Sequence, residues 1–139
     1  TQEPLLGELR YDPTPVMRGL VSCTGIDYCH LALIETKGWA IEVAKKLEER
    51  LGDAASQVKP LTIHWSGCSA GCGLHQASTI GLQGCRSRQP SGEIADAAHV
   101  FVNGASGPHA RIGLELLNDV PCSELADAML PLVKFLPRT

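Results

Sequence analysis

Two pairs of cysteines constrain this chain more than any other feature. Cys23 and Cys29 lie in "CTGIDYC", with five residues between them, and Cys68 and Cys72 lie in "CSAGC", with three. The second pair sits in a run of glycine, serine and alanine, which can fold tightly around a bound group because it has little side-chain bulk. Two thiols rarely hold a metal alone, so we expect the two pairs to act together.

Each cysteine pair follows a segment that reads as a strand. "GLVSC" (19–23) is a short apolar run into the first cysteine, and "PLTIHW" (60–65) alternates like a half-buried strand before the second pair. If these strands are neighbours, the loops that follow them gather at one end of the sheet and the four thiols converge. Four thiolates suit either zinc or an iron–sulfur cluster.

The spacing of the cysteines bears on which metal they would hold. Structural zinc sites favour about two to four residues between paired ligands, so the five-residue gap is loose for zinc and favours a cluster. A disulfide pair and a redox dithiol remain alternatives. The chain is 44% hydrophobic and shows no export signal, which favours a reducing compartment over a disulfide framework. We expect Cys85 and Cys122 to be buried small apolar residues, with a disulfide between them as the alternative.

Helical periodicity is clearest over 30–52, "HLALIETKGWAIEVAKKLEERLG". Gly38 is a candidate break and Gly52 a natural stop. One stripe of this helix is apolar and is expected to face the core: Ala40, Val43, Ala44, Leu47 and Leu51. The segment "ELADAMLPLVKFL" (124–136) predicts a final helix that Ser123 could cap and that Pro131 would kink or end.

The remaining segments complete a prediction of the fold. "STIGLQG" (78–84) and "AHVFVNG" (98–104) read as strands, with "QPSGEIADA" (89–97) as the loop between them. We expect residues 1–18 to form an extended arm broken by proline, and 19–139 to form a single domain. Helices and strands alternate at first and strands then cluster, which predicts an α+β domain with a mixed sheet and flanking helices.

Charge and composition exclude several functions. The net charge is −3 and there is no basic block, so nucleic acid is not an expected partner. No apolar run approaches the roughly 20 residues needed to span a bilayer, so we expect no membrane partner. The N-terminus has neither the basic start nor the apolar stretch of a signal peptide. The chain begins with Thr1 rather than Met, which favours a piece cut from a longer protein.

Several stretches resemble a known family of redox enzymes. "GLVSCTGIDYCHLALIETK" (19–37) and "HWSGCSAGCGLHQASTIGLQGC" (64–85) resemble the two cluster-binding segments of the sirohaem-containing nitrite and sulfite reductases. The likeness is nearest to the ferredoxin-dependent nitrite reductases. "MRGL", "ADAAHVFVNG" and "VPCSEL" resemble the C-terminal domain of that family, and the resemblance runs from about Leu5 to Arg138.

The resemblance implies a set of cofactors, partners and ligands. Cys23, Cys29, Cys68 and Cys72 would hold a 4Fe–4S cluster, and Cys72 would also be the axial ligand of the sirohaem iron. In this family nitrite is reduced to ammonia by six electrons from ferredoxin. The N-terminal portion of the enzyme would be a partner, and the 139 residues alone would be inactive. The implied location is the cytoplasm, or the plastid stroma in a plant or alga.

Four further residues are candidates for contact with the sirohaem. Arg18 and Lys37 could pair with its carboxylates, and Thr24 and Gln76 could line it. The alternative is that the first two are solvated surface charges and the other two are ordinary loop residues.

Two departures from the family keep a second function open. Ser69 and Ala70 stand where the family has Pro and Asn, and the chain is several times shorter than the family's enzymes. The alternative function is therefore a stand-alone iron–sulfur electron-transfer or regulatory module without catalytic activity, and a zinc-binding structural module is a third. The choice between nitrite and sulfite stays open, because the residues that would select the anion lie outside this chain.

Overall fold

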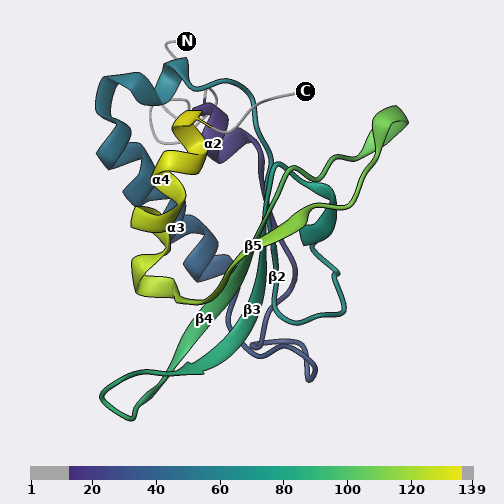
Figure 1. Ribbon diagram of the computed structural model, residues 1–139, viewed down its shortest axis with the longest axis vertical. Coiled ribbons are helices and arrows are strands. Elements are labelled where there is room, and N and C mark those ends of the chain that lie inside the picture. The colour runs from purple at the N-terminus through teal and green to yellow at the C-terminus, as the bar shows by residue number, and fades with distance from the viewer. Residues whose placement is uncertain (1–12, 136–139) are drawn as a thin grey trace, which may run out of the picture.

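The computed structural model describes residues 13–135, which form a five-stranded sheet with three helices on one of its faces (Figure 1). The strands lie side by side in chain order: β1 (Leu20–Ser22), β2 (Ile63–Ser66), β3 (Ile80–Arg88), β4 (Ile94–Val102) and β5 (Leu114–Pro121). β1, β2 and β3 are parallel, whereas β4 and β5 continue the sheet in antiparallel pairing. This mixed sheet with helices confirms the predicted α+β class.

The helices are α2 (Pro15–Arg18), α3 (Lys37–Leu51) and α4 (Leu125–Phe135). Short 3-10 helices lie in the connections: η1 (Gly52–Gln57), η2 (His75–Ala77), η3 (Gly107–His109) and η4 (Cys122–Glu124). Within the described residues, no helix is both long and apolar enough to cross a membrane.

The apolar stripe predicted on α3 is buried in the structure. Its five residues are at most 7% exposed, and they pack in one core with Ile63 and Trp65 of β2, Leu82 of β3 and Val100 of β4. The helix ends at Leu51, and Gly52 caps it with a φ of 58°, a conformation that favours glycine. The predicted stop is therefore confirmed.

The start of α3 differs from the prediction, because residues 30–36 form turns and the helix begins at Lys37. The Glu35 carboxylate accepts hydrogen bonds from the backbone amides of Lys37 (2.9 Å) and Gly38 (2.6 Å), which satisfies the first turn of the helix. Gly38 therefore lies in the first turn and does not divide the helix. Residues 30–36, which are not helical, instead bond to the cysteine loops: the Leu33 amide donates to the Gly67 carbonyl (2.8 Å), and the Ile34 carbonyl accepts from the Ile26 amide (3.1 Å).

Replacing Leu47 by Ala is expected to lower the free energy of unfolding by about 2–5 kcal/mol, since the side chain is fully buried between α3 and the sheet. Urea unfolding measures the change. The matched control on the same helix is Ile41→Ala, at a side chain that is 47% exposed, and it should cost well under half as much. Equal losses for the two variants would contradict the placement of the core.

Two predicted boundaries are wrong, one near the N-terminus and one at the start of β4. Pro15–Arg18 form a helical turn rather than extended chain, and Val16 is fully buried in the core, so this part of the expected arm packs on the domain. Residues 1–12 of that arm lie outside the described residues. β4 begins at Ile94, so residues 94–97 of the predicted loop belong to a strand, and the turn itself spans 89–93.

Three features at the C-terminal side differ from the expectations drawn from the sequence. β5 was not predicted, because Leu114 and Leu116 are exposed and the segment lacks the alternation of a half-buried strand. Pro131 does not end α4, which continues to Phe135. Pro131 and Asp127 are both exposed, so water can bond the Asp127 carbonyl that the proline leaves free. Ser123 lies within η4 rather than capping α4.

Candidate metal centre

All four cysteines of the two pairs line one cavity of about 240 Å³. The cavity lies where β1 and β2 end, because these strands are parallel and in register from Leu20↔Ile63 to Ser22↔Trp65. The loops that follow β1 and β2 therefore leave the sheet at the same edge. The other lining residues come from the same two loops and the turn before α3: Thr24, Gly25, Tyr28, Ala32 and Gly67.

The first cysteine is fixed by the backbone and by a buried threonine. The Cys23 amide donates to the Trp65 carbonyl (3.0 Å), which extends the β1–β2 pairing by one residue. The hydroxyl of Thr36, a residue with no exposed surface, donates to the Cys23 carbonyl (2.8 Å) and lies 3.8 Å from its sulfur. The Thr36 side chain was not singled out from the sequence, although it belongs to the "ETK" element of the family likeness.

Backbone amides in the second loop point at sulfur. The Gly67 amide donates to Cys23 Sγ (3.2 Å) and the Ala70 amide donates to Cys68 Sγ (3.5 Å). A Cβ on Gly67 would lie 3.0 Å from the Ala32 Cβ and 3.5 Å from Cys23 Sγ, so a side chain there would press on the cavity wall. Amides that donate to sulfur stabilise thiolate, the form that binds metal.

The four sulfurs are spread more widely than a single ion requires. Around tetrahedral zinc the sulfurs would be about 3.8 Å apart, given Zn–S bonds of about 2.3 Å. Among the described residues, no three of these four sulfurs lie within 4.8 Å of one another. The arrangement therefore fits a larger multi-iron group better than one zinc ion.

Exposed apolar side chains lie in the chain segments that carry the four cysteines. Tyr28 lines the cavity and is 82% exposed; close to the cysteines in the sequence, Leu31 is 71% exposed, Leu74 58%, and Ile26 and Leu33 each 44%. Cys72 is the exposed cysteine of the four, and the other three are partly buried. Solvent therefore reaches Cys72, and the exposed apolar side chains are ones that a further apolar surface would cover.

The four candidates for sirohaem contact do not lie together. Thr24 lines the cavity. Arg18 precedes β1, at the opposite end of the strand from Cys23, and its guanidinium donates to the Pro13 carbonyl (2.9 Å). Lys37 is exposed at the start of α3, and Gln76 is exposed in η2, where its carbonyl accepts from Gly113 N (2.8 Å). These last three do not line the cavity.

Two histidines contact the second cysteine loop and its flanks. His64 Nδ1 lies 3.2 Å from the Leu74 carbonyl, and His75 Nδ1 lies 2.8 Å from the hydroxyl of Ser66. Both rings are at least 92% buried, at 8% and 1% exposure, and burial lowers the pKa of each below its ordinary value of 6.5. They support the loop as neutral rings rather than lining the cavity.

The remaining cysteines, Cys85 and Cys122, are buried free thiols, as predicted. Burial is the main cause that raises the pKa of each from 9.0 to about 12. For Cys85 the Asp119 carboxylate adds to this, and for Cys122 the charge of Asp96 does. Both are therefore protonated at neutral pH and unreactive as nucleophiles.

The stability of the metal-free chain is expected to be greatest between about pH 6.5 and 9. Burial lowers the pKa of His64 and His75 in the folded chain. Below pH 6.5 the unfolded chain therefore binds more protons at these two residues than the folded chain does, and the free energy of unfolding falls as pH falls. Above 9.0 the unfolded chain releases thiol protons that Cys85 and Cys122 retain up to about pH 12. For each thiol, the free energy of unfolding should then fall by about 1.4 kcal/mol for every unit by which the pH rises above 9.0.

Urea unfolding at a series of pH values measures this profile. The Cys122→Ala variant is the control, since it removes one of the two thiols and should roughly halve the alkaline slope while leaving the acid slope unchanged. A stability that stays level from pH 9.0 to 11, or an alkaline slope unaffected by Cys122→Ala, would contradict the burial of these thiols.

Comparison with known proteins gives the chain a family context. It is 41% identical over 125 residues to the chloroplastic ferredoxin–nitrite reductase of Zea mays and 40% identical over 127 residues to the ferredoxin–nitrite reductase of Synechococcus elongatus. It is 36% identical over 132 residues to the assimilatory ferredoxin-dependent nitrite reductase of Haloferax mediterranei. These alignments cover 88%, 91% and 95% of this chain but only 21%, 24% and 22% of the relatives.

A solved structure agrees with these relatives. The NirA protein of Mycobacterium tuberculosis superposes with a TM-score of 0.74 and 32% identity, over 83% of this chain and 21% of its own. No family model matches the chain. The resemblance read from the cysteine motifs is thus confirmed along most of the chain: it is a homologue of one segment, about a fifth to a quarter of the whole, of the ferredoxin-dependent nitrite reductases.

Proposed function

We propose that this chain is the segment of a ferredoxin-dependent nitrite reductase that holds a 4Fe–4S cluster and one side of a sirohaem. The observation that carries the proposal is the meeting of Cys23, Cys29, Cys68 and Cys72 around one cavity. The spread of their sulfurs and the two amides that donate to sulfur support a cluster over zinc. When bound, such cofactors supply the electron-transfer and nitrite-reducing chemistry.

Cys72 is the proposed axial ligand that joins the cluster to the sirohaem iron. Its exposure supports this role, because a bridging sulfur must be reachable from both sides of the cavity mouth. Thr24 is the candidate sirohaem contact that the cavity favours. Contact of the sirohaem with Arg18, Lys37 and Gln76 remains a prediction. Because these residues lie outside the cavity, they could reach only the more distant carboxylates of the macrocycle.

Exposed apolar side chains favour a joined enzyme over a stand-alone module. Tyr28 in the cavity wall, Leu31 two residues after Cys29 and Leu74 two residues after Cys72 are exposed, and a macrocycle or another part of the polypeptide would bury them. The proposed partners are therefore ferredoxin, nitrite and the remaining portion of the reductase, in the cytoplasm or plastid stroma. The isolated 139 residues are expected to be inactive, since most of the anion-binding and sirohaem-binding residues would lie elsewhere.

Anaerobic reconstitution tests the proposal. With iron and sulfide, the chain should take up about four irons and give the absorption and paramagnetic resonance signals of a 4Fe–4S cluster. Zinc offered alone should bind the cavity more weakly than the cluster does. Stoichiometric zinc uptake that iron and sulfide cannot displace would refute the cluster.

A second measurement separates the joined enzyme from the stand-alone module. Nitrite reduction with reduced methyl viologen should be absent for this chain and present for a longer polypeptide that contains it. Activity from the 139 residues alone would contradict the proposed division of the enzyme. A longer polypeptide that carries the cluster but lacks activity with sirohaem present would favour the module.

A further inference from the structure

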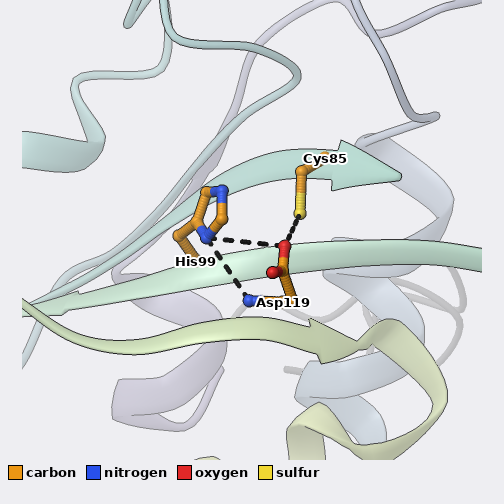
Figure 2. A group of neighbouring side chains, drawn as sticks. All are labelled: Cys85, His99 and Asp119. Atoms are coloured by element: carbon orange, nitrogen blue, oxygen red, sulfur yellow. Dashed lines mark hydrogen bonds and ion pairs between the residues drawn. The ribbon is translucent and has the colours of Figure 1, made fainter. Parts of the chain in front are cut away.

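A second group of potential metal ligands, none of them one of the four paired cysteines, lies on three adjacent strands. Figure 2 shows Cys85 of β3, His99 of β4 and Asp119 of β5 pointing toward one another. The neighbours Leu82 and Val100 face the helices, so the alternation of strand side chains places Cys85 and His99 on the opposite face of the sheet. Because Gln83 pairs with His99 and Cys85 pairs with Ala97, the thiol and the ring are diagonal neighbours.

The ligand atoms of these three residues already have metal-site spacing. Cys85 Sγ lies 3.4 Å from Asp119 Oδ1, His99 Nδ1 lies 3.9 Å from the same oxygen, and all three atoms fall within 4.8 Å of one another. Tetrahedral zinc with bonds of about 2.0–2.3 Å would separate its ligands by about 3.4–3.7 Å. It is the only such triad among the described residues, and little movement would close it on an ion.

A bulge in the sheet brings the carboxylate into place. Between the pairs Ala98↔Val120 and Val100↔Leu117, His99 alone stands opposite two residues of β5, Asn118 and Asp119. Asp119 has a φ of 53°, which is costly for a residue with a Cβ. Bulges of this kind re-aim side chains, and here the bulge turns Asp119 toward the thiol and the ring.

The donor set and its charge suit a divalent transition metal. His99 Nδ1 accepts a hydrogen bond from the Asp119 amide (3.3 Å), so in this arrangement the nitrogen is unprotonated, and a metal would take its lone pair in place of that hydrogen bond. Glu115 Oε1 lies 3.5 Å from the same nitrogen and adds a second carboxylate. Sulfur, imidazole and carboxylate together are ligands of zinc rather than of calcium or magnesium.

A catalytic cysteine is a poorer explanation of the same group. Cys85 Sγ donates to Asp119 rather than to the imidazole, so the ring is not placed to remove its proton. Burial and the Asp119 charge raise the pKa of the thiol, whereas an activated nucleophile has a lowered one. A metal ion binding there would displace that proton instead.

Solvent can reach the group. A cavity of about 420 Å³ has Cys85 and His99 in its wall, together with Gln83, Leu31 and the Cys68–Ala70 end of the second cysteine loop. We propose that Cys85, His99 and Asp119 form a binding site for one Zn²⁺ ion, with Glu115 within reach as a fourth ligand. The site adjoins the four-cysteine cavity, since Cys68 lines both cavities, but it shares none of its three ligands with that cavity.

Zinc titration of the full chain tests the site. The parent for the test carries Cys29→Ser and Cys72→Ser, which remove one thiol from each pair of the other cavity. The parent should hold one Zn²⁺ per chain in competition with a chromophoric chelator. His99→Ala and Asp119→Asn should each weaken that binding by at least about 100-fold, since even outer-shell partners are worth about 10- to 100-fold.

Two matched controls make the test specific. His109→Ala removes an exposed histidine outside the site and should leave zinc affinity unchanged. With Co²⁺ in place of zinc, Cys85→Ser should abolish the thiolate-to-cobalt absorption that this site adds, whereas Cys122→Ser, at the other buried thiol, should keep it. Asn adopts positive φ at least as readily as Asp, so Asp119→Asn should fold, and circular dichroism checks that it does.

The site is refuted if the parent binds no zinc. It is also refuted if His99→Ala, Asp119→Asn and His109→Ala bind zinc with one affinity, or if the cobalt band survives Cys85→Ser. None of these outcomes depends on whether the four-cysteine cavity holds a cluster.

Discussion

Replacing Cys68 by Ser is expected to reduce the iron content of the reconstituted chain from about four atoms to less than one. A 4Fe–4S cluster needs a thiolate at each iron, and the Ser hydroxyl is a poor substitute for a sulfur that accepts the Ala70 amide (3.5 Å). Cys23→Ser should have the same effect, because Cys23 Sγ accepts from Gly67 and lines the same cavity. Iron and sulfide analysis after anaerobic reconstitution measures the loss.

Two variants control for general damage. Ser69→Ala changes an exposed side chain of the same loop and should keep about four irons. Cys122→Ala removes a buried thiol outside the cavity and should also keep them. If Cys68→Ser retains a full cluster, or if Cys122→Ala loses it, the assignment of the four ligands is wrong.

Replacing Gly81 by Ala is expected to destabilise the fold by about 3 kcal/mol or more, the largest effect we expect from one added methyl group. A Cβ at this position would lie 1.6 Å from the His75 carbonyl oxygen, which is backbone and cannot rotate away. Gly81 lies inside β3, paired on one side with His64 and on the other with Phe101, so the strand cannot shift alone.

Urea unfolding gives the size of the effect, and Gly92→Ala is the matched control. A Cβ on Gly92 meets no atom within 4 Å, but its φ of 91° makes any side chain strained, so a cost of about 1–2 kcal/mol is expected there. The difference between the variants isolates steric overlap from backbone strain. Similar losses would show that η2 does not lie against β3 as described.

The meeting of the four cysteines could be predicted from the sequence, because their positions follow from the order of the strands. Cys23 and Cys68 come at or just after the ends of two strands, and parallel pairing brings such ends to one edge. The buried stripe of α3 could also be predicted from the sequence, since its apolar residues recur with the period of a helix. A sequence pattern was enough to predict these features because strand pairing and helical periodicity fix their geometry.

The Cys85, His99 and Asp119 group could not be read in the same way. Its geometry depends on the register of β3, β4 and β5 and on a bulge that places two residues opposite His99. β5 is mostly exposed and gave no strand pattern, and Asp119 in a left-handed conformation has no sequence signal of its own.

The short length of β1 has a consequence for how the cavity is filled. β1 has three residues, lies at the edge of the sheet and pairs only with β2, yet it carries the loop that supplies two of the four thiols. Edge segments with few ladder hydrogen bonds open more readily than a domain unfolds. Peeling away β1 would part the two halves of the ligand set while the rest of the sheet stays intact. Loading and loss of a metal group would then follow the opening rate of one strand, not the rate of global unfolding.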